Sequence, residues 1–111
     1  MQRRDFVVLK KVISEIDIAD QLMNDTSIEE FLNDEVLKRA ISMTIINIRE
    51  LIKNVTDELR NEHPEIPWKA VAGMRDITAH KYQTLRMEDV YNTVQIDLPV
   101  LKNQLQGILD E

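Results

Sequence analysis

The chain contains no cysteine, and this absence removes three kinds of chemistry at once. Disulfide bonds, thiolate metal sites and thiol nucleophiles all need that side chain. Glycine and proline are scarce, with 2 and 3 residues in 111, and aromatic residues make up only 5%. A chain with so few turn-forming residues is expected to form long helices rather than many short strands.

Long hydrophobic runs are also missing from the sequence. No window approaches the roughly 20 apolar residues that a membrane span needs. Near the first residue, the apolar run in MQRRDFVVLKKV is interrupted by Lys10 and Lys11 and is too short for the core of a signal peptide. We therefore expect a cytoplasmic protein that makes no membrane contact. At 111 residues, we expect residues 1–111 to form a single domain with a real but modest core.

Excess positive charge is absent as well. The formal net charge of −6 argues against a protein that coats nucleic acid nonspecifically, because neutralising phosphates needs a basic surface. One stretch differs from the rest of the chain: residues 68–86 hold four basic residues against a single acidic one, Asp76. The basic residues are Lys69, Arg75, Lys81 and Arg86. Any contact with an anionic ligand is expected there.

The first half of the chain shows helical periodicity. Apolar residues recur every three or four positions between Phe6 and Met23, which predicts an amphipathic helix of about six turns. A longer helix is predicted from about residue 34 to 61. One of its faces carries Leu37, Ile41, Ile45, Ile48, Ile52, Val55 and Leu59. A smaller apolar group, Val36, Met43 and Ile46, points nearly the opposite way. Such a helix either lies at the centre of a bundle or packs against a second subunit, and the small size of the domain favours the second subunit.

The second half of the chain is divided by prolines. Pro64 and Pro67 separate the long helix from a helix predicted over 68–81, with Trp68 as a core anchor. A last helix is predicted from Met87, and Pro99 inside its apolar pattern predicts a kink or break near Asp97. His63, in the polar NEHPE stretch, is expected to be a solvated loop residue. The fold class is all-α, an up-and-down bundle of four to five helices.

The stretch RDITAHKY, residues 75–82, combines a fixed cation with a group that moves protons near neutral pH. Arg75 can hold two phosphate oxygens through its guanidinium fork, and His80 can act as an acid or a base. RNA cleavage without a metal needs just such proton transfer and stabilisation of charge on the phosphate. For an isolated pair at this spacing, however, a structural role or none is the default interpretation.

The spacing within this motif raises a geometric problem. On an ideal helix Arg75 and His80 are separated by about 140° and about 7.5 Å, so they do not share a face. Either the helix loosens near Ala79, or the site forms in a cleft between two subunits. The second arrangement agrees with the two apolar faces of the long helix. Tyr82 lies seven residues from Arg75 and nearly shares its face; it could also be a core residue with its hydroxyl outward.

Four segments together resemble the HepT-type toxins of the HEPN superfamily. They are Ile48–Glu50 (an Ile-x-Glu element), PEIPW at 64–68, GMRDITAHKY at 73–82 and DLPVLKNQL at 97–105, in the same order and at similar spacing. The resemblance covers the chain from the long helix onward. It implies a HEPN-like helical fold, a homodimer with both motifs lining the shared cleft, and an endoribonuclease that acts on RNA and uses no cofactor.

The same resemblance assigns roles to individual residues. Arg75 and His80 correspond to the catalytic residues. Tyr82 corresponds to the tyrosine that a partner antitoxin, a minimal nucleotidyltransferase, modifies with AMP. Supporting roles are expected for Asp76, which stands where many relatives have Asn, and for Lys81.

Glu50, the glutamate of the Ile-x-Glu element, is a further candidate for a supporting role. Many relatives have glycine before this glutamate, whereas this chain has Arg49. A bulky cation at that point would change the angle of the dimer or add a phosphate contact.

Two functions remain open at this point. One is a metal-independent endoribonuclease toxin that a nucleotidyltransferase antitoxin neutralises. The alternative is a non-catalytic HEPN dimer that serves as the binding partner of a nucleotidyltransferase, which the acidic net charge favours. No metal site is expected in either case, because the two histidines are far apart and no acidic cluster has ligand spacing.

Overall fold

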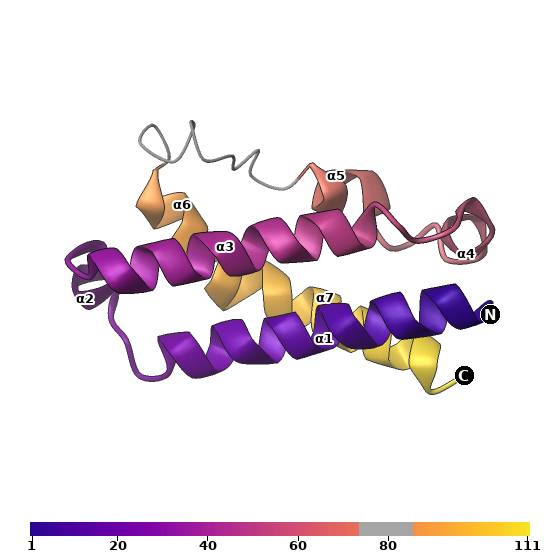
Figure 1. Ribbon diagram of the computed structural model, residues 1–111, viewed down its shortest axis with the longest axis horizontal. Helices are drawn as coiled ribbons and strands as arrows, with labels where there is room; N and C mark the ends of the chain where they lie inside the picture. The colour runs from indigo at the N-terminus through magenta and orange to yellow at the C-terminus, as the bar shows by residue number, and fades with distance from the viewer. Residues whose placement is uncertain (74–85) are drawn as a thin grey trace.

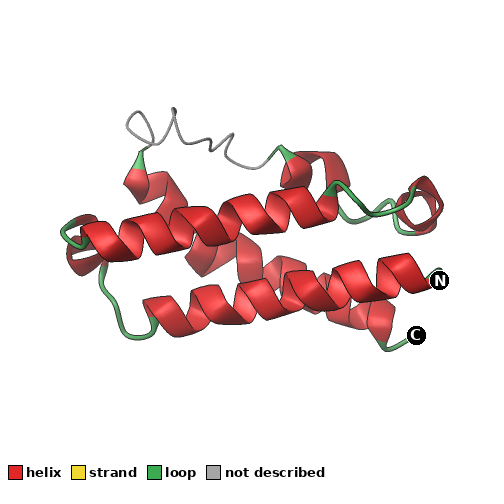
Figure 2. Ribbon diagram, viewed as in Figure 1, coloured by secondary structure: helices red, strands yellow, loops and turns green. Residues whose placement is uncertain are grey.

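The fold, given by a computed structural model, is described for residues 1–73 and 86–111. All regular structure in these two ranges is helical, which confirms the all-α class for this part of the chain (Figure 2). The elements are α1 (Arg3–Met23), α2 (Ile28–Leu32), α3 (Glu35–Ile52), α4 (Asp57–Glu62), α5 (Trp68–Ala72), α6 (Met87–Asn92), the π-helix η2 (Thr93–Asp97) and α7 (Leu98–Leu109).

Three long helical runs form the body of the molecule (Figure 1). α1 and α3 lie side by side and run in opposite directions, and α7 packs against α1 on its way back toward the end where the chain began. The short helices α2 and α4 lie at opposite ends of α3. None of the described helices is long and apolar enough to cross a membrane.

The core lies where these three runs meet, and it is almost entirely aliphatic. The apolar spacing predicted for the first helix places Leu9, Val12 and Ile16 in it, because residues three or four apart share a helix face. The other fully buried large side chains include Phe31, Ile41, Ile45, Ile48, Ile52, Leu98 and Leu105. Phe6 departs from the predicted stripe: it is 41% exposed, and the Lys10 ammonium lies 5.2 Å from its ring centroid.

The long helix predicted over 34–61 is wrong in its extent. α3 ends at Ile52, and a separate helix, α4, begins at Asp57. Thr56 is the N-cap of α4, where its hydroxyl accepts a hydrogen bond from the Leu59 amide. Its own amide and hydroxyl donate to the buried carboxylate of Asp5. Polar side chains therefore accept hydrogen bonds from the backbone amides at the break. The spacing of apolar residues alone does not reveal such a break.

The kink or break predicted near Asp97 takes the form of a change of helix type, because the backbone stays helical through Asp97 and Leu98. The π-helix Thr93–Asp97 lies directly before α7, which carries Pro99 in its first turn. Proline lacks an amide proton and its ring crowds the carbonyl four residues earlier, so an α-helix cannot pass through it unchanged. α7 is tied to α1 by the Lys102 Nζ, 2.6 Å from Asp17 Oδ1. The hydrogen bond and charge of Asp17 raise the pKa of this lysine.

Candidate functional site

Five of the six predicted site residues lie outside the described part of the chain. Arg75, Asp76, His80, Lys81 and Tyr82 all fall between residues 74 and 85. The described structure shows how the chain is held on each side of them. α5 ends at Ala72, and α6 begins at Met87 after its N-cap, Arg86.

α5 is held by its side chains rather than by its own length. Five residues make little more than one turn, which is too short to be stable alone. Trp68 is buried as predicted, and its indole Nε1 donates to the His63 carbonyl at 3.0 Å. Val71 is buried beside the core. The amide of Gly73 closes the last turn on the Lys69 carbonyl at 3.0 Å. The polypeptide is therefore fixed at the point where it enters the motif.

α6 is anchored in a comparable way. Val90 is fully buried, and the Tyr91 hydroxyl donates to the Thr26 carbonyl at 3.1 Å. The Tyr91 ring also packs on Phe31 of α2, with 5.7 Å between the ring centroids. The chain after the motif is thus joined to the α2 end of the molecule. Both flanks of residues 74–85 are attached to buried structure.

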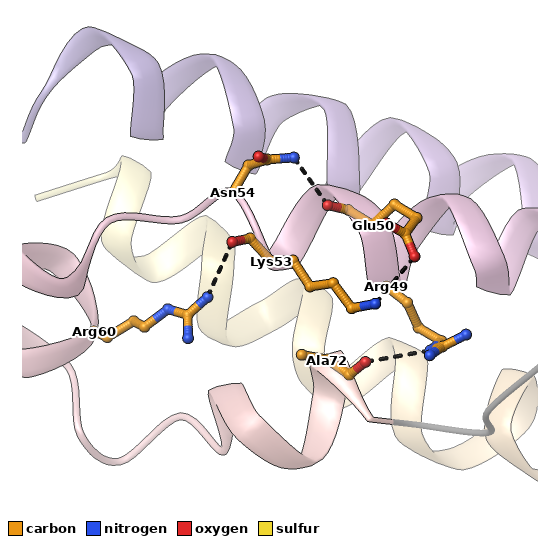
Figure 3. Close-up of polar contacts among 6 residues, drawn as sticks. All are labelled: Arg49, Glu50, Lys53, Asn54, Arg60 and Ala72. Atoms are coloured by element: carbon orange, nitrogen blue, oxygen red, sulfur yellow. Dashed lines mark hydrogen bonds and ion pairs between the residues drawn. The ribbon is translucent and has the colours of Figure 1, made fainter.

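Glu50 is the one predicted site residue that the structure describes. It lies near the end of α3 with its side chain exposed, and its Oε1 is 3.1 Å from Lys53 Nζ (Figure 3). An exposed pair of this kind contributes little to stability. Glu50 also borders an open groove between α1 and α3, of about 410 Å³, with Lys11, Glu15 and Asn47 among its neighbours.

Arg49, the neighbouring residue, behaves differently. Its side chain is only 7% exposed, and its Nε donates to the backbone carbonyl of Ala72 at 3.2 Å. Figure 3 shows the guanidinium reaching from α3 to the last residue of α5. Arg49 therefore makes this contact within one subunit, between α3 and α5. The signal in the sequence was its register, since Arg49 continues the buried positions Ile45 and Ser42 along α3.

His63 corrects a further expectation. Its side chain is only 12% exposed, whereas a solvated loop residue was predicted. Its Nδ1 lies 3.2 Å from Glu65 Oε1 and its Nε2 lies 3.6 Å from Glu111 Oε1. Because its carbonyl also receives the Trp68 indole, His63 belongs to the packing around α5. Within residues 1–73 and 86–111, no three or more His, Asp or Glu side chains gather as a metal site would require.

Comparison with known proteins gives the family. Residues 12–108 match the family model described as Ribonuclease HepT-like. The chain is 29% identical over 108 residues to a protein of Thermococcus cleftensis named as a probable ribonuclease HepT, covering 97% of this chain and 98% of that protein.

Two further relatives are each named as a putative RNase. One, from Caldanaerobacter subterraneus subsp. tengcongensis, is 32% identical over 93% of this chain and 92% of its own length. The other, from Methanocaldococcus jannaschii, is 30% identical over 100% of this chain and 97% of its own length. No solved structure matches the chain. The resemblance that the motifs indicated is confirmed, and the chain belongs to the HepT-like ribonuclease family.

Proposed function

We propose that the chain is a metal-independent endoribonuclease in which His80 transfers protons and Arg75 stabilises charge on the reacting phosphate. The observation that carries this proposal is the family match over residues 12–108, which includes the whole RDITAHKY stretch. Family membership gives a ribonuclease; the division of roles follows from the chemistry of the two side chains.

The proposed reaction is a transesterification that consumes no water. The 2′-oxygen of one nucleotide attacks the adjacent phosphorus, and the bond from phosphorus to the 5′-oxygen breaks. A base takes the 2′-OH proton and an acid gives a proton to the leaving 5′-oxygen, so one product ends in a 2′,3′-cyclic phosphate and the other in a 5′-OH. Proton transfer contributes about 10²- to 10⁴-fold in such reactions. The need for the 2′-OH restricts the substrate to RNA.

The described flanks of the motif support access by an anionic substrate. Lys69 on α5 and Arg86 before α6 are both exposed, one on each side of residues 74–85. Arg86 Nε lies 3.6 Å from Glu88 Oε2, an exposed pair that a phosphate could displace at small cost. The basic character of this stretch thus extends to both of its described edges, although the whole chain is acidic.

We also propose that two copies pair through the exposed face of α3. Val36 and Met43 are exposed there, seven residues apart, and Glu50 follows seven residues later. Residues spaced by seven drift only about 20° per step, so the three side chains lie along one face. The core residues Ile41, Ile45, Ile48 and Ile52 occupy the opposite face. The family resemblance implies that the two motifs of such a dimer line a shared cleft. Arg75 and His80 could then act together although about 140° separates them on one ideal helix.

Regulation is proposed to act on Tyr82. A nucleotidyltransferase antitoxin that transfers AMP to the Tyr82 hydroxyl would form a phosphodiester there and release pyrophosphate from ATP. Tyr82 is only seven residues from Arg75 in the sequence. The added phosphate would bring negative charge and bulk to the proposed site, which would repel the RNA backbone and block its binding. The support for this step is the resemblance of GMRDITAHKY to the modified motif of HepT-type proteins.

The test of the nuclease proposal is a cleavage assay with purified, unmodified protein. We expect RNA cleavage that persists in EDTA, leaves a cyclic phosphate end, and falls by about 10²- to 10⁴-fold in His80→Ala. DNA of the same sequence should stay intact. If wild-type protein and His80→Ala leave RNA equally intact while both form a complex with a nucleotidyltransferase, the non-catalytic alternative replaces this proposal.

A further inference from the structure

Burial of the Arg49 guanidinium needs an explanation, because a charged group removed from water is costly unless its donors are paired. One of the groups that pairs it is the Ala72 carbonyl, 3.2 Å from Nε. Ala72 is the last residue of α5, and the final carbonyls of a helix have no partner within the helix. Arg49 therefore supplies, from α3, a donor that α5 cannot supply for itself.

The position of Ala72 in the chain gives this contact its interest. Arg75 is only three residues further along, and Gly73 is the last described residue before the motif. α5 has five residues, so its direction depends on what holds it to the body. Trp68 and Val71 are buried and hold its apolar side. Arg49 holds its C-terminal carbonyl (Figure 3). Ala72 is joined to Arg75 through only two residues, so its position sets where the chain enters the motif.

We propose that Arg49 is a positioning residue for the nuclease motif: it fixes the C-terminal end of α5 against α3 and so sets where the motif begins. This inference rests on the proposed function. Direct binding of substrate phosphate is the competing role for a cation near the motif. The 7% exposure and the engagement of Nε with a backbone carbonyl favour support over direct binding.

The chain offers a matched control in Arg60. Its Nη2 donates to the carbonyl of Ile52 at 3.1 Å, at the end of α3. The same nitrogen donates to the carbonyl of Lys53 at 3.4 Å (Figure 3). Arg60 thus makes the same kind of bond, from a partly buried guanidinium to carbonyls at a helix end, but these bonds go to the end of α3 rather than to α5. Arg49→Met and Arg60→Met each leave a long unbranched side chain at the position and remove the hydrogen-bond donors of the guanidinium.

The experiment measures kcat and KM for RNA cleavage, together with the unfolding temperature, in wild type and both variants. We expect kcat of Arg49→Met to fall by about 10- to 100-fold, since small misplacements of catalytic groups have effects of that order, with KM nearly unchanged. Arg60→Met should also lose stability but keep its kcat. Arg49→Lys should recover part of the rate, because it restores a charged donor without the fixed geometry of Nε.

The outcomes separate this inference from the proposed function. An inactive wild type would remove the nuclease proposal itself. With an active wild type, equal effects of the two Met variants on kcat would overturn the positioning role, and so would a rise in KM alone, which would mark Arg49 as a phosphate ligand. If Arg49→Met does not fold, the same comparison is made between Arg49→Lys and Arg60→Lys, with the same criteria.

Discussion

Asp5 shows at the level of one residue how this small core accommodates a charge. It is 1% exposed, yet it lies in the first turn of α1 and contacts the start of α4, 51 residues later. One carboxylate oxygen accepts from the Thr56 amide at 2.9 Å and the other from the Thr56 hydroxyl. Hydrogen bonds to a charged group are stronger than neutral ones, so this contact fixes the N-terminal helix to the α3–α4 break.

Removing this carboxylate should have a large effect for one side chain. In Asp5→Ala the buried Thr56 donors lose their acceptor, and we expect the free energy of unfolding to fall by about 2–4 kcal/mol. Thr56→Ala should cost about 1–2 kcal/mol through loss of the α4 N-cap as well. Urea denaturation of both single variants and the double variant measures this, and the double variant should lose less than the sum of the two.

Asp20→Ala serves as the control for this series. Asp20 is an exposed carboxylate on the same helix, and its removal should change stability by no more than about 0.5 kcal/mol. Strict additivity of Asp5→Ala and Thr56→Ala would contradict the contact, because two residues that bond only to separate partners do not couple.

The partners of Asp5 and Arg49 could not be identified from the sequence, although the register of Arg49 along α3 indicated a buried position. Each acquires its partner from a distant segment, Thr56 for the first and Ala72 for the second. In both cases at least one of the bonded groups is a backbone amide or carbonyl, which every residue carries. Residue types therefore say nothing about the pairing.

At the scale of the helices, the sequence predicted a change of helix geometry correctly where a single proline causes it. Pro99 forces a change of helix geometry by its covalent structure, and the π-helix lies directly before it. The prediction failed between α3 and α4, where Val55 and Leu59 are buried and keep the apolar spacing through the break. Thr56 was the available signal, since threonine followed by two acidic residues is a good helix start.

The dependence of α5 on its anchors can be tested by amide exchange. Trp68→Phe removes the indole bond to His63 and should cost about 1 kcal/mol. Because α5 is too short to hold itself, the loss should appear mainly as faster exchange of the Val71 and Gly73 amides, which close the helix on Pro67 and Lys69.

Tyr91→Phe is the matched variant for this measurement. It also removes one bond from an aromatic side chain to a backbone carbonyl, that of Thr26 in this case, but on the α6 side of the motif. Its cost should be similar, and the Val71 and Gly73 amides should exchange as in wild type. Equal acceleration of these amides in both variants would mean that α5 opens only with the whole molecule.

At the scale of the whole molecule, the sequence says more about the candidate site than the described residues do, because most of the site residues lie between 74 and 85. RDITAHKY and its order among PEIPW and DLPVLKNQL led to the family, and the family match confirms it. The assembly could not be obtained in the same way. Burial within one chain explains Ile45 and Ile48, but the exposed Val36 and Met43 fit either solvent or a second copy equally well at the level of residue type.

The proposed pairing through α3 therefore requires a measurement on the assembled protein. Val36 is 79% exposed and Met43 is 56% exposed, and an apolar stripe of this kind is stabilised when a second copy covers it. We expect sedimentation equilibrium to give the mass of a dimer for wild type. Met43→Asp should shift the equilibrium toward the monomer, because pairing about a two-fold axis places the same face against itself and would bury two like charges together.

The discriminating control is Val100→Asp. Val100 is as exposed as Met43 and lines an apolar groove of about 340 Å³ with Pro67 and Ile96, between α5 and α7. If copies pair through α3, Val100→Asp should remain a dimer. At a protein concentration low enough for both variants to be monomeric, the two should unfold at nearly the same denaturant concentration. A wild type that is monomeric at all concentrations would remove the dimer. Dissociation by Val100→Asp but not by Met43→Asp would place the interface at the groove between α5 and α7 instead of the exposed face of α3.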